Sequence, residues 1–307
     1  MPLAALTIRG VQDTNQQIIA LLNENGIDTI EIPKGLTKED RLAMLKPCDA
    51  ILCGMEPYDE ETLDQLPNLK ILARQGVGID QIDVAACKAR GIKVAKAVGA
   101  VEVPVSELIM AMMLHFSRNL IEMNEAMHDH RWQPMLGEGL LGKRIGLIGF
   151  GGIGKEVAKK AAAFSMNISY YTRYRDEHDT IYRATYTPLP RLLEKNDYIV
   201  VNVPLTKETY HMIGEAELRQ MRPNGVLINT SRGDVVDQEA LAKALKEGVI
   251  RGAGVDVYPN EPTTDSPLMD CPNAVLTPHV GTYTSRGVLD MGKKAAWHII
   301  ETLTDHK

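Results

Sequence analysis

The sequence predicts an α/β protein built from two doubly wound parallel-sheet domains with a cleft between them. Three observations support this prediction. Short apolar runs alternate with amphipathic helical segments along most of the chain, which is the pattern of parallel strands joined by crossover helices. This alternation occurs in two blocks, separated by a long helical segment that begins near residue 103. The length of 307 residues is about that of two domains.

The first block, residues 1–101, contains five apolar runs of strand type. Gly26 and Gly91 each follow a helical segment, where a helix end favours a residue with positive φ. Strands separated by helices in this way imply a parallel sheet covered on both faces. The predicted strands are Leu3–Ile8, Thr29–Ile32, Ala50–Leu52, Ile71–Ala73 and Lys93–Ala95, and the predicted helices are Asn15–Asn25, Lys38–Leu45, Glu60–Gln65 and Val84–Ala89.

The second block opens with one long helix, Val103–Met127, that we expect to connect the two domains. Six strands follow, and the last helix, Ser285–Leu303, is expected to return to the first domain. The expected boundaries are 1–101 plus 283–307 for one domain and 102–282 for the other. The six strands are Arg144–Ile148, Asn167–Tyr171, Tyr198–Val201, Gly225–Asn229, Gly252–Val255 and Ala274–Leu276, with helices that include Lys155–Ala163, Leu189–Glu194, Glu215–Met221 and Gln238–Glu247.

The composition is that of a soluble globular protein, with 44% apolar and 24% charged residues. A formal net charge of −6 argues against nucleic-acid binding, which usually needs a basic face. No apolar stretch reaches the ~20 residues that span a bilayer, and the N-terminus lacks the features of a signal peptide. The four cysteines form no C-x-x-C pair. We therefore predict a cytoplasmic protein that has no metal site and binds neither membranes nor nucleic acids.

A glycine loop at the start of the second domain predicts the cofactor class. The apolar strand Arg144–Ile148 runs into Gly149, Gly151 and Gly154, which have the spacing G-x-G-x-x-G. The first glycine permits a tight turn, the second lets a pyrophosphate approach the backbone, and the third lets the next helix pack closely. The N-terminus of the helix Lys155–Ala163 then faces the phosphate site. The sequence therefore predicts a Rossmann domain that binds a dinucleotide.

The end of the second strand of this domain indicates which dinucleotide is bound. An acid about 20 residues beyond the glycine loop would bind the ribose of NAD, but Thr172 and Arg173 occupy this place, with Arg175 close behind. Arginine suits bidentate phosphate binding, so we predict a preference for NADP over NAD. The alternative is that the two arginines are solvated charges, paired with Asp176 and Glu177.

Polar residues at three further strand ends form a candidate catalytic set. Arg232 follows one strand, Asp256 ends the next, Glu261 lies in the loop beyond it, and His279 follows the last strand. Ligands of open α/β sheets bind at the carboxyl ends of strands, so these loops can converge on one crevice. Arginine can hold a carboxylate, and a histidine beside a glutamate can donate a proton near neutral pH.

Six motifs in the right order make the chain resemble a known family. They are Gly76–Asp80, Gly149–Gly154, Val203–Thr206, Thr230–Gly233, Asp256–Pro262 and Pro278–Gly281. Over essentially its full length the chain is similar to the D-isomer-specific 2-hydroxyacid dehydrogenases. The resemblance implies a flavodoxin-like substrate domain, a Rossmann NAD(P)-binding domain and a homodimer formed through the latter. It also implies hydride transfer between NAD(P)H and a small 2-oxo acid.

The resemblance further implies roles for particular residues. Arg232 would bind the carboxylate of the 2-oxo acid, and His279, supported by Glu261, would protonate the carbonyl oxygen. The backbone at Val77 and Gly78 would also hold the carboxylate. The cofactor would be lined by Gly149, Gly151, Gly152, Ile153, Gly154, Thr172, Arg173, Val203, Pro204, Thr209, Thr230, Ser231, Arg232, Asp256, His279 and Gly281, with Asp256 on the nicotinamide carboxamide.

The substrate prediction leaves alternatives open. The residues Thr172-Arg173 at the strand end are similar to those of glyoxylate and hydroxypyruvate reductases, and we favour the reduction of such small 2-oxo acids. Arg74 is instead typical of phosphoglycerate dehydrogenases, where it could meet a substrate phosphate. Gly152 replaces a basic residue that is common in the family. A dinucleotide-sensing co-repressor and a flavin enzyme are further alternatives, but the chain lacks the flanking tails of the first, and the Arg, Glu and His set does not favour the second.

Overall fold

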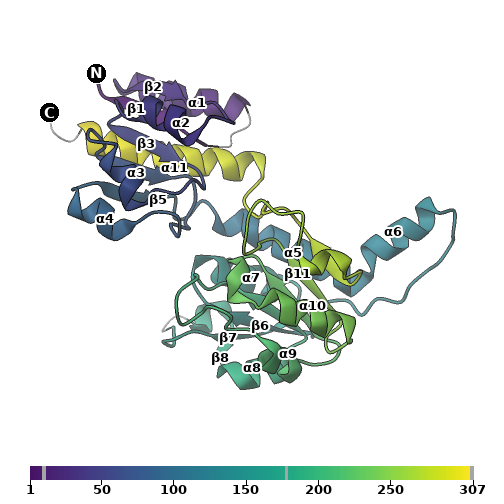
Figure 1. Ribbon diagram of the computed structural model, residues 1–307. Helices are drawn as coiled ribbons and strands as arrows, with labels where there is room; N and C mark the ends of the chain where they lie inside the picture. The colour runs from purple at the N-terminus through teal and green to yellow at the C-terminus, as the bar shows by residue number, and fades with distance from the viewer. Residues whose placement is uncertain (9–11, 177–178, 305–307) are drawn as a thin grey trace. The chain divides into compact units, whose positions relative to one another are not determined.

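The computed structural model describes residues 1–8, 12–176 and 179–304 (Figure 1). The chain divides into two compact units, one formed by Met1–Val101 with Thr282–Lys307 and the other by Glu102–Gly281. Each unit is an α/β structure around its own parallel sheet, so the predicted fold class is confirmed. No helix within the described ranges is long and apolar enough to cross a membrane.

The first unit contains a five-stranded sheet in the order β2-β1-β3-β4-β5. Every pair of neighbouring strands is parallel, as the alternation of strands and helices predicts. The strands are β1 (Leu3–Leu6), β2 (Asp28–Glu31), β3 (Ala50–Cys53), β4 (Ile71–Arg74) and β5 (Lys93–Lys96). Strands β1 and β3 are almost wholly buried, which is expected where helices cover both faces.

Five helices cover this sheet. Helices α1 (Gln12–Glu24) and α11 (Ser285–Thr304) pack on one face. They approach closely because Gly292 has no side chain: a Cβ there would lie 2.2 Å from Cδ1 of Ile18. The other face is covered by α2 (Lys38–Leu45), α3 (Glu60–Asp64) and α4 (Val84–Ala89). The C-terminal helix therefore completes the core that the N-terminal residues begin.

The second unit contains a seven-stranded parallel sheet in the order β12-β11-β10-β9-β6-β7-β8. Helices α5 (Glu102–Arg118) and α7 (Gly152–Ala163) cover one face, and α8 (Leu189–Lys195), α9 (Glu215–Gln220) and α10 (Gln238–Lys246) cover the other. The strand order reverses between β6 and β9, where open α/β sheets bind ligands. The strands are β6 (Arg144–Ile148), β7 (Asn167–Tyr171), β8 (Ala184–Tyr186), β9 (Tyr198–Val201), β10 (Val226–Asn229), β11 (Gly252–Val255) and β12 (Ala274–Leu276).

Two predictions about the elements of this unit were wrong. The prediction of six strands missed β8, which has only three residues and pairs with β7 at the edge of the sheet. The single helix predicted over 103–127 is two helices, α5 and α6 (Leu120–His128). The break lies at Asn119, whose φ of 51° is left-handed, a conformation that asparagine tolerates better than most residues. Arg251 donates to the carbonyl oxygen of Phe116 and to Oδ1 of Asn119, and so stabilises the break.

Candidate active site

The glycine loop connects β6 to α7, and its three glycines are required for different reasons. Gly149 has a φ of +99°, and a Cβ on it would lie 2.6 Å from the carbonyl oxygen of Asn202. A Cβ on Gly154 would lie 2.5 Å from the carbonyl oxygen of Gly149. A Cβ on Gly151 would meet nothing within 4 Å. The fold itself therefore needs the first and third glycines, whereas the second leaves open space beside the backbone for a phosphate.

The two other residues of this loop that we predict to line the cofactor, Gly152 and Ile153, face the interior of the unit. A Cβ on Gly152 would lie 2.7 Å from Cγ of Glu102, the first residue of α5. Glu102 therefore fills the space that a larger residue at position 152 would need. Ile153 packs, partly buried, against the core beneath α5 and α7. The loop thus presents its backbone, rather than these side chains, to a ligand at the N-terminus of α7.

Two buried polar side chains lie beside the loop without a hydrogen-bond partner. In the pairing of β9 with β10, Val201 is opposite Asn229, so Asn202 and Thr230 are the next residues on adjacent strands. Both polar atoms of the Asn202 side chain and Oγ1 of Thr230 are buried and unpaired among the residues that the structure describes. Buried polar groups almost always have a partner. These atoms, with the open backbone at Gly151, fit the ribose and diphosphate groups of a dinucleotide.

The loop that follows β9 lies against the glycine loop. A Cβ on Gly149 would lie 3.1 Å from Cγ1 of Val203. Oγ1 of Thr209 donates to the carbonyl oxygen of Pro204 at 2.6 Å and accepts from the backbone nitrogen of Thr206 at 2.8 Å. Thr209 therefore holds the loop in a compact turn, and Val203 and Pro204 lie at the side of the predicted cofactor site.

Thr172 and Arg173 follow β7, where the adenosine ribose of a dinucleotide lies in this fold. Arg173 is exposed, and it makes no hydrogen bond or ion pair with any residue in the described ranges. The hydroxyl of Thr206 and, more weakly, the charge of Arg173 lower the pKa of Glu208. The charge of Arg173 therefore acts on an acid of the loop that follows β9.

Arg175 has a different environment from Arg173. Its Nε donates to Oδ2 of Asp179 at 3.0 Å, and this hydrogen bond holds the pKa of Asp179 below its ordinary value. Asp176, one of the two acids considered as its partner, forms an ion pair with Lys155 at 2.7 Å, and Glu177 lies outside the described residues. Arg175 is therefore tied to the fold, and Arg173 is the better placed of the two for a ligand phosphate.

Arg232 lies directly after β10, in a loop that is organised by Asn229. Oδ1 of Asn229 accepts from the backbone nitrogen and the hydroxyl of Ser231, at 3.1 and 2.8 Å. Its Nδ2 donates to the carbonyl oxygen of Arg232 at 2.9 Å. A Cβ on the next residue, Gly233, would lie 2.1 Å from the carbonyl carbon of Tyr258. The loops that follow β10 and β11 are therefore in direct contact.

His279 and Glu261 form a hydrogen bond at this edge of the sheet. Nδ1 of His279 lies 2.5 Å from Oε2 of Glu261, and Oε1 of Glu261 accepts from the backbone nitrogen of Tyr258 at 2.8 Å. Burial opposes the ionisation of Glu261. The hydrogen bond and charge of His279, with a smaller contribution from Arg232, nevertheless lower the pKa of Glu261. The structure thus places His279 and Glu261 in direct contact, and the loops that carry Arg232 and Glu261 touch each other.

Asp256 holds the loop that carries His279. Its Oδ1 accepts from Oγ1 of Thr277 at 2.6 Å and from the backbone nitrogen of Val280 at 2.8 Å, and its Oδ2 accepts from the backbone nitrogen of Gly281 at 2.8 Å. Burial raises the pKa of Asp256, against the effect of these hydrogen bonds. They clamp both sides of His279, whose φ of 53° is unusual for a residue other than glycine.

We expect the substitution Asp256→Asn to loosen this loop. An amide nitrogen cannot accept a hydrogen bond, so at least one donor of the loop becomes unpaired, which costs ~1–3 kcal/mol for a buried group. Thermal or urea unfolding should show this loss, together with a several-fold decrease in kcat. The matched control is Asp237→Asn at the half-buried N-cap of α10, which should change neither stability nor kcat, because asparagine caps a helix about as well as aspartate. An unchanged unfolding midpoint in Asp256→Asn would contradict the clamp.

The predicted substrate residues Arg74, Val77 and Gly78 lie in the other unit, at the carboxyl end of β4. The guanidinium of Arg74 donates to the carbonyl oxygens of Gly78 and Gln75, at 3.1 and 2.5 Å. Val77 and Gly78 are partly exposed. Arg74 therefore helps to shape this loop, a use of its charge that the sequence motif does not indicate.

Asn202 and Asn229 are the site residues that the sequence motifs do not single out. Each is the first polar residue after the apolar run of a buried strand, Tyr198–Val201 or Val226–Ile228. A polar side chain that ends such a strand is the pattern that could have identified them. Across the described part of the chain, no three His, Cys, Asp or Glu side chains gather as metal ligands.

The chain is similar in sequence to known proteins. Residues 110–281 match the family described as D-isomer specific 2-hydroxyacid dehydrogenase, NAD binding domain. A glyoxylate reductase from Thermococcus litoralis is 40% identical over 297 residues, covering 90% of both chains. A D-3-phosphoglycerate dehydrogenase from Methanocaldococcus jannaschii is 35% identical, and the match covers 94% of this chain but 56% of the relative.

The fold is also shared with solved structures. The crystal structure of a glyoxylate reductase from Paecilomyes thermophila superposes with a TM-score of 0.87 at 29% identity, covering 100% of this chain and 96% of the other. The family match covers more than half of the chain, and the relative from Thermococcus litoralis extends it to both units. The protein therefore belongs to the D-isomer-specific 2-hydroxyacid dehydrogenase family and is an NAD(P)-dependent oxidoreductase.

Proposed function

We propose that this enzyme reduces small 2-oxo acids of the glyoxylate and hydroxypyruvate type, with NADPH as the preferred hydride donor. The observation that carries the proposal is the hydrogen bond of Glu261 to His279, together with the contact between the loops that carry Arg232 and Glu261. The relative from Thermococcus litoralis, named a glyoxylate reductase, supports this substrate class. We assign the unit Glu102–Gly281 to cofactor binding and the other unit to substrate binding.

The proposed mechanism uses each of the three side chains for one task. The guanidinium of Arg232 binds the substrate carboxylate and stabilises negative charge that develops on the neighbouring carbonyl oxygen. His279 donates a proton from Nε2 to that oxygen. Glu261 accepts the hydrogen bond of Nδ1, which orients the ring. The nicotinamide, when bound, supplies the hydride.

A substrate panel tests this function. The purified protein would be assayed with NADPH and with NADH against glyoxylate, hydroxypyruvate, pyruvate, branched 2-oxo acids and phosphohydroxypyruvate. We expect the highest kcat/KM for NADPH with an unphosphorylated acid. Turnover confined to NADH and phosphohydroxypyruvate would replace the proposal with a phosphoglycerate dehydrogenase activity, the second candidate, which Arg74 and the relative from Methanocaldococcus jannaschii favour.

We propose that Arg173 is responsible for NADPH preference. A charge-assisted hydrogen bond is worth ~1.5–3 kcal/mol, so Arg173→Ser should weaken NADPH binding at least tenfold and leave NADH binding nearly unchanged. Cofactor titration by nucleotide fluorescence measures both affinities. The matched control is Arg175→Ser: it removes the partner of Asp179 and should lower stability without changing the ratio of the two affinities. An equal loss of both cofactors in Arg173→Ser would argue against the assignment.

We also propose that the enzyme is a homodimer, formed through an arm of the cofactor-binding unit. The arm consists of α6 and residues 129–141, which extend beyond the sheet and its covering helices (Figure 1). It is anchored where the backbone nitrogen of Glu138 donates to the carbonyl oxygen of Ser117. Leu136 is 99% exposed and Trp132 is 86% exposed. Large exposed apolar side chains that gather on one segment are typical of an interface.

The arm can be tested by charge substitution. Trp132→Asp with Leu136→Asp should convert the dimer to a monomer, because each buried large apolar side chain is worth ~1.5–3 kcal/mol. Light scattering of the purified protein would show the mass halved. The control is Tyr174→Asp, also exposed but outside the arm. A dimer that persists in the double variant would place the interface elsewhere.

We further propose that the enzyme works in the cytoplasm. All four cysteines are free and buried, which suits a reducing compartment. Cell fractionation followed by immunoblotting tests this location.

A further inference from the structure

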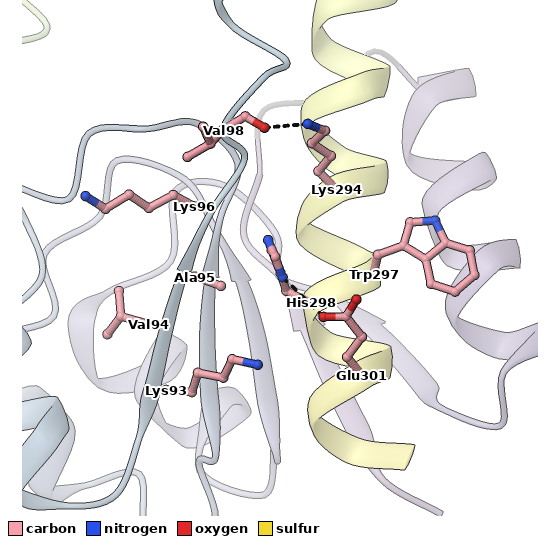
Figure 2. A pocket seen from close by; sticks show the side chains of 9 residues that line it. All are labelled: Lys93, Val94, Ala95, Lys96, Val98, Lys294, Trp297, His298 and Glu301. Atoms are coloured by element: carbon pink, nitrogen blue, oxygen red, sulfur yellow. Dashed lines mark hydrogen bonds and ion pairs between the residues drawn. The ribbon is translucent and has the colours of Figure 1, made fainter. Parts of the chain in front are cut away.

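The first unit contains a groove that the proposed reaction does not use. It lies between the edge strand β5 and helix α11 and has a volume of about 690 Å³. Figure 2 shows its two walls, with Lys294 of α11 reaching to the carbonyl oxygen of Val98. The residues that line it are Lys93, Val94, Ala95, Lys96, Val98, Lys294, Trp297, His298 and Glu301. All of them belong to the same unit.

One wall of the groove offers open backbone hydrogen-bonding groups. β5 is the last strand of the sheet, with β4 as its neighbour. The backbone nitrogens of Lys93 and Ala97 donate toward β4, to the carbonyl oxygens of Lys70 and Gly76. In a parallel ladder alternate residues bond to the same neighbour, so the N–H and C=O groups of Val94 and Lys96 point to the open edge. An extended peptide could form four main-chain hydrogen bonds there.

The side chains around this edge favour a negatively charged occupant. Three lysines line the groove against a single acid, Glu301, and that acid already lies 3.5 Å from Nδ1 of His298. Lys93 and Lys96 form no ion pair with any residue inside the described ranges. This concentration of positive charge contrasts with the formal net charge of −6 of the whole chain. A ligand attracted here carries negative charge at the positions that face the lysines.

Apolar surface accompanies this charge on both faces of β5. Ala95 forms part of the buried core on the α11 side of the sheet, and strand residues alternate between faces. Lys93 therefore shares the face of Ala95, whereas Val94 and Lys96 lie on the opposite face. Trp297, 49% exposed, adds an aromatic surface from α11. This edge suits an extended chain with alternating acidic and apolar residues, whose acidic side chains lie on the face of Lys93 and whose apolar side chains lie on the face of Val94.

We propose that this groove binds an extended acidic segment of a partner protein, which adds to the sheet as a sixth strand beside β5. The main-chain groups of Val94 and Lys96 bind its backbone, and Lys93 and Lys294, on the α11 side of the sheet, bind its acidic side chains. This interaction is independent of the reductase activity proposed above. The same lysines would also be present if they served only to prevent edge-to-edge aggregation, so the experiment separates these two roles.

The test uses Trp297 as a reporter in the full-length protein. The chain has two tryptophans, and Trp132→Phe leaves Trp297 as the single one. The probe is a blocked octapeptide of alternating Val and Asp, titrated at low salt while the emission of Trp297 is recorded. The comparison ligands are the same peptide with N-methylated Asp residues, an alternating Val and Lys peptide, succinate and inorganic phosphate. We expect a saturable change with the acidic peptide alone.

Two variants locate the binding. Val94→Pro removes one outward N–H and spares the ladder to β4, a substitution that edge strands tolerate. It should weaken peptide binding about fivefold to tenfold, as expected for one main-chain hydrogen bond. Lys93→Glu should weaken binding at least tenfold, and the control Lys46→Glu on the exposed end of α2 should not. Reduction of glyoxylate should continue in all three variants, whatever the result for the peptide.

The outcomes that overturn the proposal are distinct. If the N-methylated peptide or succinate binds as well as the original peptide, the groove is a general anion patch and no strand is added. If no probe changes the emission of Trp297, the lysines only protect the edge. The N-methylated peptide is tested on the otherwise unaltered protein, so the conclusion holds even if Val94→Pro fails to fold.

Discussion

The substitution His279→Gln is expected to lower kcat for the reduction of 2-oxo acids by ~10²–10⁴-fold, the usual contribution of a general acid. Glutamine keeps a polar side chain of similar size but cannot donate a proton as an imidazolium does. The loop should survive the change, because it is held by Asp256 through the backbone nitrogens of Val280 and Gly281. Stopped-flow measurement of NADPH oxidation gives the rate, and fluorescence titration gives the affinity for NADPH.

The affinity for NADPH should stay nearly constant in this variant, since the proton donor acts on the substrate. The control is His128→Gln, at the exposed end of α6, which should change neither quantity. A rate within a few-fold of the original protein would mean that another group, or water, supplies the proton. A parallel loss of rate and NADPH affinity would indicate that the site has lost its structure.

The substitutions Gly151→Ala and Gly154→Ala should show which glycine is required for cofactor binding and which is required for stability. A methyl group on Gly151 meets nothing within 4 Å, and its φ of −78° suits alanine. We therefore expect unchanged stability, but at least tenfold weaker binding of NADPH and NADH, a loss of about 1.4 kcal/mol. The methyl group would stand where the pyrophosphate approaches the backbone. Isothermal titration with each cofactor measures the effect.

Gly154→Ala should behave in the opposite way. Its methyl group would lie 2.5 Å from the carbonyl oxygen of Gly149, so the loop or α7 must shift, and overpacking of this kind costs ~1–3 kcal/mol. Urea unfolding should show the loss even without cofactor. Normal cofactor binding by Gly151→Ala would mean that the diphosphate does not approach this loop, and the proposed cofactor site would have to be abandoned.

The sequence predicts the parts of this protein that depend on local patterns. Buried parallel strands appear as apolar runs, and the glycine spacing of 149, 151 and 154 follows from a turn that few other residues can form. The strand β8 escapes such prediction because three residues are too few to show a pattern, and its position is decided by pairing with β7. The break at Asn119 likewise depends on Arg251, which is distant in the sequence.

The residues of the candidate site also divide into those that the sequence identifies and those that only the structure shows. Arg232, Glu261 and His279 are conspicuous polar residues after apolar strands, so their sequence context identifies them. Asn229 acts on the site only through hydrogen bonds to its neighbours' backbone. Nor does the sequence indicate that Arg175 is bound to Asp179 while Arg173 remains available. Such differences depend on the direction of each side chain, which only the folded chain determines.

The close approach of Gly152 to Glu102 has an evolutionary consequence. The two residues belong to different helices, α7 and α5, yet they share one small volume. A larger residue introduced at position 152 would collide with Glu102 unless the side chain at position 102 became smaller or moved. Effects of substitutions at such neighbours do not add, so a larger residue at position 152 should be better tolerated once position 102 is smaller. The order in which mutations occur at these two positions is therefore constrained. Variants that replace one residue at a time would make this loop seem less tolerant of change than it is.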